Sequence, residues 1–110
     1  MLIQKIPKSE FKVMKFIWEI NDVVTSKMLR EAMKDKYGWE ATTTLTFLKN
    51  LVEKHFLDAE RINRLTHYKI LITEKEYKNY VTKKFLEDIH DNSLESLAES
   101  LLLINKAQKK

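Results

Sequence analysis

The first half of the chain contains segments in which hydrophobic residues recur at helical spacing. Pro7 and Ser9 favour a helix start, and apolar side chains between residues 8 and 20 cover much of the helix circumference. This pattern is typical of a helix at the centre of its domain. A second helix is expected to begin at Thr25 or Ser26, because either hydroxyl can cap it.

A third helix follows the second after a short break. The second is expected to end near Gly38, which is the only glycine in the chain, and the third to span about residues 41–54. The residues expected to face inward from the third helix are Phe47, Leu48, Leu51 and Val52. Periodicity leaves open whether Thr44 or Leu45 faces inward with them.

Two strand-like runs come next, over residues 57–62 and 65–72. The second run alternates apolar and polar positions, with Tyr68, Ile70 and Ile72 on one side. Asn63, in the turn between the runs, is the residue there that best tolerates a positive φ. The pattern therefore predicts a β-hairpin directly after the third helix.

The pattern changes after the hairpin. Residues 73–76 form a capping box that opens a long helix, and Asn92–Ser93 separates it from a last helix. Two amphipathic helices cannot bury their own apolar faces, so we expect another chain to cover them. The candidate dimerisation residues are Phe85, Ile89, Leu94, Leu97, Leu101 and Ile104.

These elements predict a mainly α fold with a small β-hairpin wing. We interpret residues 1–72 as a winged helix-turn-helix domain and residues 73–110 as a C-terminal helical dimerisation region. A short helix with small polar side chains, followed by a basic hairpin, is the arrangement that a winged helix presents to a DNA groove.

Composition and charge agree with this interpretation. The chain has 110 residues, 44% of them hydrophobic and 33% charged, which suits one domain or a small domain with an appendage. Residues 1–72 contain 13 Lys and Arg against 9 Asp and Glu, whereas residues 73–110 contain 7 of each. The whole positive excess therefore lies with the proposed DNA-binding part, which suits a polyanionic ligand.

Several classes of protein are disfavoured. The chain has no Cys, its first residues lack the apolar core of a signal peptide, and no apolar run is long enough to cross a bilayer, so we expect a cytoplasmic protein. His55, His67 and His90 are too scattered for a metal set. No phosphate-binding glycine loop and no nucleophile with a base is evident, so we expect neither a cofactor nor catalysis.

The residues resemble a known family. Residues 10–14 (Glu-Phe-Lys-Val-Met), followed by Trp18 and Trp39, are similar in spacing to the penicillinase repressors, which regulate β-lactamase, methicillin-resistance and some copper-export genes. The spacing continues through Thr43, Thr46, Leu51, Lys54, Phe56 and Tyr68. The resemblance implies a homodimer held by the C-terminal helices, with the third helix of each protomer in the major groove of a palindromic operator. It also implies that Thr44 faces inward and Leu45 outward.

The candidate DNA contacts lie on the second and third helices and on the hairpin. Threonine hydroxyls can bond phosphate or base edges, Asn50 can pair with adenine, Lys49 supplies charge, and an exposed Leu45 can meet a thymine methyl. The arginines of the hairpin are expected to contact the DNA backbone. The full set is Thr25, Ser26, Thr42, Thr43, Leu45, Thr46, Lys49, Asn50, Arg61 and Arg64.

The chain departs from the family at several positions. His55 stands where the family usually has glycine, and Leu45 and Asn50 stand where members often have arginine. Induction in the β-lactam branch involves cleavage at an Asn–Phe pair, but Leu97–Ala98 occupies that region here. The cysteine motif of the copper-responsive branch is absent as well. Release by an unknown inducer or protease is therefore left open.

Two hypotheses about function follow. The first is a dimeric transcriptional repressor that binds a double-stranded DNA operator. The second is a winged-helix module that binds proteins and not DNA, which the absence of arginine from the third helix and the presence of Glu53 keep open. The two differ in salt dependence, because only a DNA-binding protein loses DNA affinity as salt rises.

Overall fold

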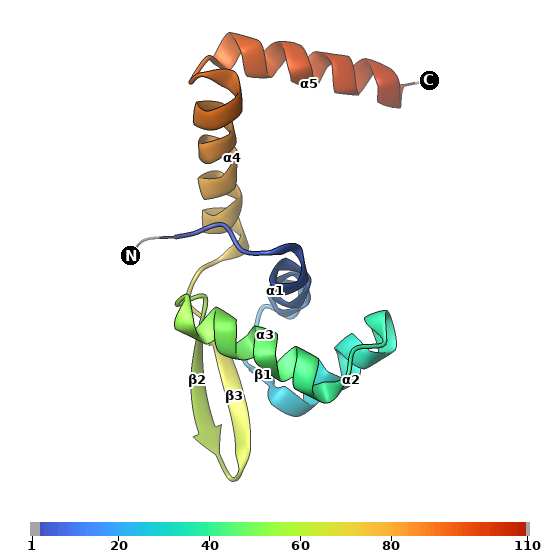
Figure 1. Ribbon diagram of the computed structural model, residues 1–110, viewed down its shortest axis with the longest axis vertical. Helices are drawn as coiled ribbons and strands as arrows, with labels where there is room; N and C mark the ends of the chain where they lie inside the picture. The colour runs from blue at the N-terminus through green and yellow to red at the C-terminus, as the bar shows by residue number, and fades with distance from the viewer. Residues whose placement is uncertain (1–2, 110) are drawn as a thin grey trace. The chain divides into compact units, whose positions relative to one another are not determined.

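The computed structural model describes residues 3–109, which form helices and one small sheet (Figure 1). The helices are α1 (Lys8–Ile20), α2 (Ser26–Tyr37), α3 (Ala41–Glu53), α4 (Glu74–His90) and α5 (Leu94–Gln108). The strands are β1 (Val24–Thr25), β2 (Leu57–Ile62) and β3 (Leu65–Ile70). The predicted order of helices and hairpin is confirmed. The two-residue strand β1 was not predicted, because it is too short to show an alternating pattern.

The chain divides into two compact units inside α4, one up to Glu76 and the other from Tyr77 onward. We call them the winged-helix unit and the C-terminal unit. The division lies close to the boundary after residue 72 that the sequence suggests. The first turn of α4 thus belongs with the winged-helix unit.

The core of the winged-helix unit is built around α1. Val13, Met14 and Ile17 on this helix are completely buried, as the all-round apolar pattern predicts. The side chains that complete the core from other segments are Leu29, Met33, Leu48, Leu51, Phe56 and Leu57. Each side chain of this size is worth roughly 1.5–3 kcal/mol when fully buried. The unit therefore closes a core of its own.

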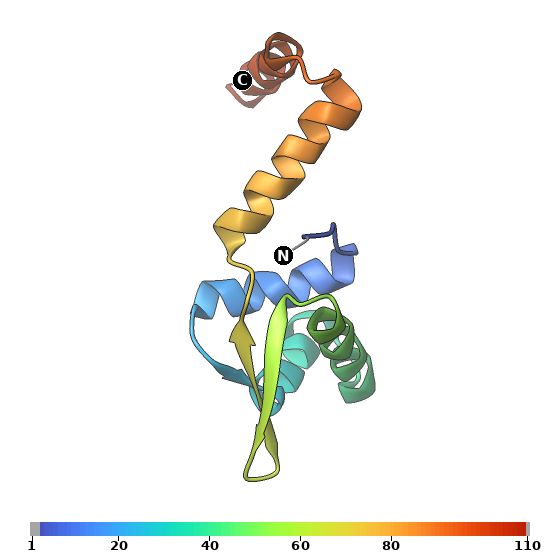
Figure 2. The ribbon, with the colours of Figure 1, turned by 90° about the vertical axis from the view of Figure 1, so that its left-hand side faces the viewer.

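The sheet has the order β1-β3-β2, with antiparallel neighbours. Tyr68 in β3 lies opposite Val24 on one side and Ala59 on the other, and the neighbouring His67 lies between Thr25 and Glu60. The β2–β3 turn consists of Asn63 and Arg64, whose φ angles are 50° and 67°. Positive φ at both central residues is the type I′ pattern, which fits the twist of a hairpin. In Figures 1 and 2 this hairpin projects beyond the helices of its unit, on the side opposite α1.

The ends of the helices follow local chemistry. The Thr25 hydroxyl accepts a hydrogen bond from the Met28 amide at 3.2 Å, so Thr25 and not Ser26 caps α2. Gly38 ends α2 in the left-handed conformation, as predicted. His55 also has a positive φ, 62°, so the position usually held by glycine keeps its left-handed conformation here.

The capping box at the start of α4 is confirmed. The Glu76 amide donates to the Thr73 hydroxyl at 3.1 Å, and the Thr73 amide donates to the Glu76 carboxylate at 2.9 Å. Within the C-terminal unit, Asp91 and Asn92 have positive φ and separate α4 from α5. Ser93 then caps α5 by accepting from the Ser96 amide.

Candidate nucleic-acid interface

One face of α3 is open to solvent along most of its length. Four of its exposed residues, Thr42, Leu45, Thr46 and Lys49, follow the spacing i, i+3, i+4, i+7, which places them in one stripe, and the exposed Glu53 ends the same face. On the other side, Thr44, Leu48 and Leu51 are buried. We call the four exposed residues the α3 stripe. It combines two hydroxyls, one apolar side chain and one cation on a helix that can enter a groove.

The choice between Thr44 and Leu45 is settled in favour of the arrangement that the family resemblance implies. Thr44 is completely buried, whereas Leu45 is 40% exposed. The Thr44 hydroxyl has no hydrogen-bond partner among the described residues. Leu45 is thus available to a ligand and Thr44 is not.

The remaining threonines of α3 differ in their availability. The Thr46 hydroxyl donates to the Thr42 carbonyl at 2.9 Å and keeps its lone pairs free to accept a bond from another group. Thr43 is half-buried and lies beside the α3 stripe. Thr42 and Thr46 are therefore better placed than Thr43 to meet a ligand.

Asn50 does not belong to the α3 stripe. Its amide nitrogen lies 3.3 Å from a carboxylate oxygen of Glu10 on α1, so the side chain is directed into the protein. The other carboxylate oxygen of Glu10 lies 2.6 Å from the Lys54 ammonium. Glu10 is only 3% exposed, and a buried carboxylate needs such partners. The structure thus argues against the expected pairing of Asn50 with adenine.

The start of α2 exposes fewer candidate DNA contacts than the sequence predicted. Ser26 is buried, with 8% of its surface exposed, which argues against a direct contact with DNA. Thr25 is half-buried, and its hydroxyl is already engaged in capping α2. Of these two candidates, only Thr25 reaches the surface to a useful extent.

The hairpin carries the cations beside α3. Arg61, at the end of β2, and Arg64, in the turn, are both exposed. Lys69 in β3 is exposed as well. Arg64 holds a positive φ that a side chain other than Gly, Asn or Asp rarely adopts, so this turn is strained. The hairpin therefore presents two arginines near the point where the chain reverses.

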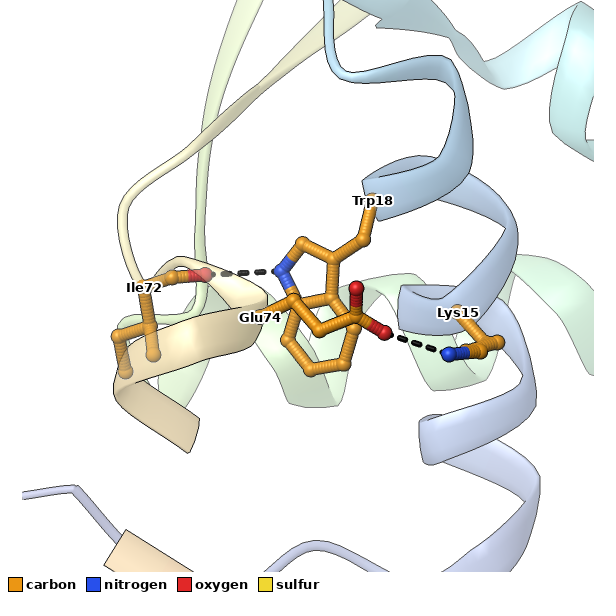
Figure 3. Close-up of polar contacts among 4 residues, drawn as sticks. All are labelled: Lys15, Trp18, Ile72 and Glu74. Carbon is orange, nitrogen blue, oxygen red and sulfur yellow. Dashed lines mark hydrogen bonds and ion pairs between the residues drawn. The ribbon is translucent and has the colours of Figure 1, made fainter. Parts of the chain in front are cut away.

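The segment that leaves the sheet is fastened to α1 by two polar contacts (Figure 3). The Trp18 indole N–H donates to the Ile72 carbonyl at 2.9 Å. The Lys15 ammonium lies 2.6 Å from a Glu74 carboxylate oxygen, and this hydrogen bond raises the pKa of Lys15. The apolar pattern of residues 8–20 is consistent with the burial of Trp18, but the sequence predicted neither contact.

The burial of Glu10, which contacts Asn50 and Lys54, could have been predicted from local spacing in the sequence. Glu10 shares the spacing i, i+3, i+4, i+7 with Val13, Met14 and Ile17, which are core residues. A carboxylate on the buried face of a helix requires a cation nearby. The spacing therefore indicates burial, although it does not indicate which lysine is the partner.

The C-terminal unit exposes the hydrophobic residues predicted for dimerisation. Of the described residues of α5, none is buried. The exposed fractions are 47% for Phe85, 63% for Ile89, 72% for Leu94, 56% for Leu101 and 54% for Ile104, while Leu97 is half-buried. Leu102 and Leu103 are exposed as well, at 62% and 69%.

His90 contacts neighbouring side chains of its own unit. His90 ends α4, with its Nδ1 2.8 Å from the Ser96 hydroxyl and its ring against Phe85. Among residues 3–109, no group of three or more His, Cys, Asp or Glu side chains is arranged to hold a metal ion. No described helix combines the length and the apolar character needed to cross a bilayer.

The fold and the α3 stripe define a winged-helix protein of the DNA-binding class. The sequence matches the model of the penicillinase repressor family over residues 6–110, so the chain belongs to that family. The family consists of DNA-binding transcriptional repressors and not of enzymes.

Individual relatives agree with this membership. The chain is 26% identical over 93 residues to the methicillin resistance regulatory protein MecI of Staphylococcus aureus, which covers 84% of this chain and 75% of MecI. It is 29% identical over 85 residues to an uncharacterized 16.5 kDa protein from the ptsI 3′ region of Latilactobacillus sakei, covering 77% of this chain and 58% of that protein.

Two solved structures are similar to this one. The first is the solution structure of the DNA-binding domain of the repressor BlaI, with a TM-score of 0.63 and 26% identity. The second is monomeric Bacillus licheniformis BlaI in complex with the blaP half-operator, with a TM-score of 0.59 and 26% identity. Each match covers 69% of this chain and 92% of the BlaI chain.

Proposed function

We propose that this chain represses transcription as a homodimer bound to a palindromic DNA operator, with α3 of each protomer in the major groove. The observation that carries the proposal is the α3 stripe, flanked by the exposed arginines of the hairpin. The similar BlaI chain, solved in its monomeric form in complex with a half-operator, supports binding of operator DNA by this fold. Such a protein acts where the chromosome is, in the cytoplasm.

The residues of the interface differ in their roles. The Thr42 hydroxyl can accept from or donate to base edges, the Thr46 hydroxyl can accept from them, and the exposed Leu45 suits the methyl group of thymine. Lys49 follows them along the stripe and can reach a base or a phosphate. Thr43 and Thr25 contribute at the edge of the interface, whereas Arg61 and Arg64 bind the DNA backbone.

The dimer rests on the exposed apolar residues of α4 and α5. Leu94, Leu97, Leu101 and Ile104 form one stripe of α5, and they are largely uncovered within this chain. A second copy offers an identical stripe, which suits a two-fold interface. Two-fold symmetry in turn matches a palindrome whose half-sites lie about one helical turn apart.

A salt titration of DNA binding tests the proposal. The full-length chain is first allowed to select a preferred duplex from a random-sequence library. Its affinity for that duplex falls steeply as salt rises, because each phosphate contact releases counterions. A protein-interaction module shows no DNA affinity to lose, and that result would refute the proposal.

Two substitutions separate base reading from backbone binding. Thr46→Ala relaxes sequence preference at one base pair, with a loss of about 1–3 kcal/mol on the preferred duplex. Arg64→Ala weakens binding to every sequence and lowers the salt slope by about one unit. Equal losses of Thr46→Ala on preferred and scrambled duplexes would contradict the base-reading role.

Release from the operator follows a route other than cleavage at an Asn–Phe pair. Leu97 is half-buried within α5, and the pair Leu97–Ala98 stands in the corresponding region. An unidentified inducer or a protease acting elsewhere is the remaining means of release. Intact protein in cells exposed to a β-lactam, measured by mass spectrometry, is the expected result. A fragment ending at Leu97 would contradict it.

A further inference from the structure

Glu10 joins α1 to α3 and to the residue that caps α3, Lys54, through two bonds that end on the same carboxyl group. One oxygen lies 2.6 Å from the Lys54 ammonium and the other 3.3 Å from the Asn50 amide nitrogen. The partners are 44 and 40 residues away in sequence. The side chain of Glu10 is 4% exposed and that of Lys54 24%, so the pair is shielded from solvent.

These two bonds have a preferred direction, whereas the buried side chains of α3 described below pack through apolar contacts. The buried residues Leu48 and Leu51 pack without preferred direction, and the Thr44 hydroxyl has no partner among the described residues. The hydrogen bond from the Thr46 hydroxyl to the Thr42 carbonyl stays within the helix. Charge-assisted hydrogen bonds to a buried carboxylate are among the stronger polar contacts. Glu10 therefore gives α3 contacts with a defined direction, which apolar packing does not provide.

The geometry of α3 turns this contact into a constraint on rotation. Asn50 lies about 100° around the helix from Lys49, the last residue of the α3 stripe, and Lys54, which caps α3, follows Asn50 by four residues on the same flank. A rotation of α3 by about 20° about its axis moves a side-chain tip by about 2 Å, given a helix radius of about 5–6 Å with side chains. A hydrogen bond to a base edge does not survive such a displacement.

We propose that Glu10 is a positioning residue for DNA reading: it fixes the rotation of α3 and holds the Lys54 ammonium away from DNA. The inference rests on the proposed function. It assigns a role in sequence discrimination to a buried residue on α1, a helix that lies on the opposite side of the unit from the hairpin turn (Figures 1 and 2). Glu10, Asn50 and Lys54 touch no base under this proposal.

A double-mutant cycle in the full-length chain tests it. The variants are Glu10→Gln, Lys54→Met and the two combined, and affinities are measured for the duplex selected by the unmodified chain and for a scrambled duplex of equal composition. Matched controls are Glu19→Gln, an exposed α1 carboxylate, and Lys15→Met, whose ion pair with Glu74 does not involve α3. Circular dichroism at the assay temperature establishes that each variant is folded.

The expected result is a loss of discrimination without a loss of general DNA affinity. Each single variant lowers affinity for the selected duplex about five- to tenfold, comparable to one mismatched base pair, and leaves the scrambled duplex nearly unchanged. The double variant loses no more affinity for the selected duplex than the single variant that binds it less tightly, because the same contact is broken in all three. The two controls leave the ratio of affinities unchanged.

Other results would overturn the inference. Equal losses on both duplexes for Lys54→Met, with a smaller salt slope, would make Lys54 a phosphate contact. Stronger binding of both duplexes by Glu10→Gln would mean that the carboxylate merely repels DNA, and unchanged ratios of affinities would mean that its position is irrelevant.

If Glu10→Gln fails to fold, Asn50→Ala replaces it. Asn50 is partly exposed, and its replacement removes one bond to Glu10 while the Glu10–Lys54 ion pair remains. Loss of preference at a single base pair in that variant would assign Asn50 to base reading. Failure of the unmodified chain to select any duplex would instead refute the proposed function.

Discussion

The two compact units of this protein differ in how far their large hydrophobic side chains are buried. In the winged-helix unit, large side chains such as Met14, Leu48 and Phe56 are completely buried. In the C-terminal unit, Leu94 and Ile104 are 72% and 54% exposed, and only Tyr77 and His90 are buried on α4 and α5 among the described residues.

The difference follows from the number of elements that can cover each face. Three helices and a sheet surround one core in the winged-helix unit, so every amphipathic face meets another. The C-terminal unit consists of most of α4 together with α5, and two helices leave most of their apolar surface uncovered. An exposed apolar surface of this kind marks an interaction site. One unit therefore closes its core within the chain, and the other leaves an apolar surface open for the dimer proposed above.

The largest expected effect comes from charging the exposed stripe of α5. Leu97→Asp combined with Leu101→Asp removes burial worth about 3–6 kcal/mol per protomer, at roughly 1.5–3 kcal/mol for each leucine. Sedimentation equilibrium at micromolar concentration should show the native chain as a dimer and this variant as a monomer with poor operator affinity. Lys106→Asp makes the same change of two charge units on another face of α5 and should remain dimeric. A native chain that sediments as a monomer would contradict this account.

The two units should behave differently when they are made as separate polypeptides. A fragment ending at Glu76 keeps the Trp18–Ile72 and Lys15–Glu74 contacts and the capping box, so it should melt cooperatively at a temperature independent of protein concentration. A peptide of residues 77–110 should gain helicity as its concentration rises, since its apolar faces need a partner. Circular dichroism measures both. Concentration-dependent melting of the first fragment would show that the winged-helix unit is incomplete.

A smaller effect is expected from Thr44, within the core of the winged-helix unit. Thr44→Val replaces a buried hydroxyl without a hydrogen-bond partner by a methyl group of similar size. We expect a stabilisation of about 1 kcal/mol, because burying an unpaired hydroxyl is costly. Thermal unfolding of the fragment ending at Glu76 measures it. Thr46→Val on the exposed face is the control and should change stability by less than about 0.5 kcal/mol. Equal shifts in the two variants would exclude the proposed cause.

The smallest effect concerns acid titration at the junction of the units. The backbone amide and then the hydroxyl of Thr73 bond to the Glu76 carboxylate and lower its pKa below the ordinary value of 4.5. Since the folded-state pKa is lowered, the contribution to stability is present above the unfolded pKa and is lost as pH falls through the folded pKa. Carbon NMR of the Glu76 carboxyl should give a midpoint below 4.5. Thr73→Ala should raise that midpoint, and an unchanged midpoint would rule out the capping box as the cause.

Local sequence chemistry accounts for most of the fold. Hydrophobic spacing predicted the helices, Thr73 and Glu76 predicted the capping box, and Asn63 predicted the hairpin turn. These features depend on residues a few positions apart, so their geometry can be derived from the chain alone. The outward orientation of Leu45 required the family resemblance in addition, because periodicity allowed either of two neighbours to face inward.

The sequence by itself thus determined a winged helix followed by two helices with an uncovered apolar stripe, together with family membership. Only the tertiary structure decided which polar side chains of α3 are free. It directed the Asn50 amide toward Glu10, and it paired Lys15 with Glu74 across 59 residues of chain. Contacts between residues so far apart in sequence depend on how helices pack, which no local spacing encodes.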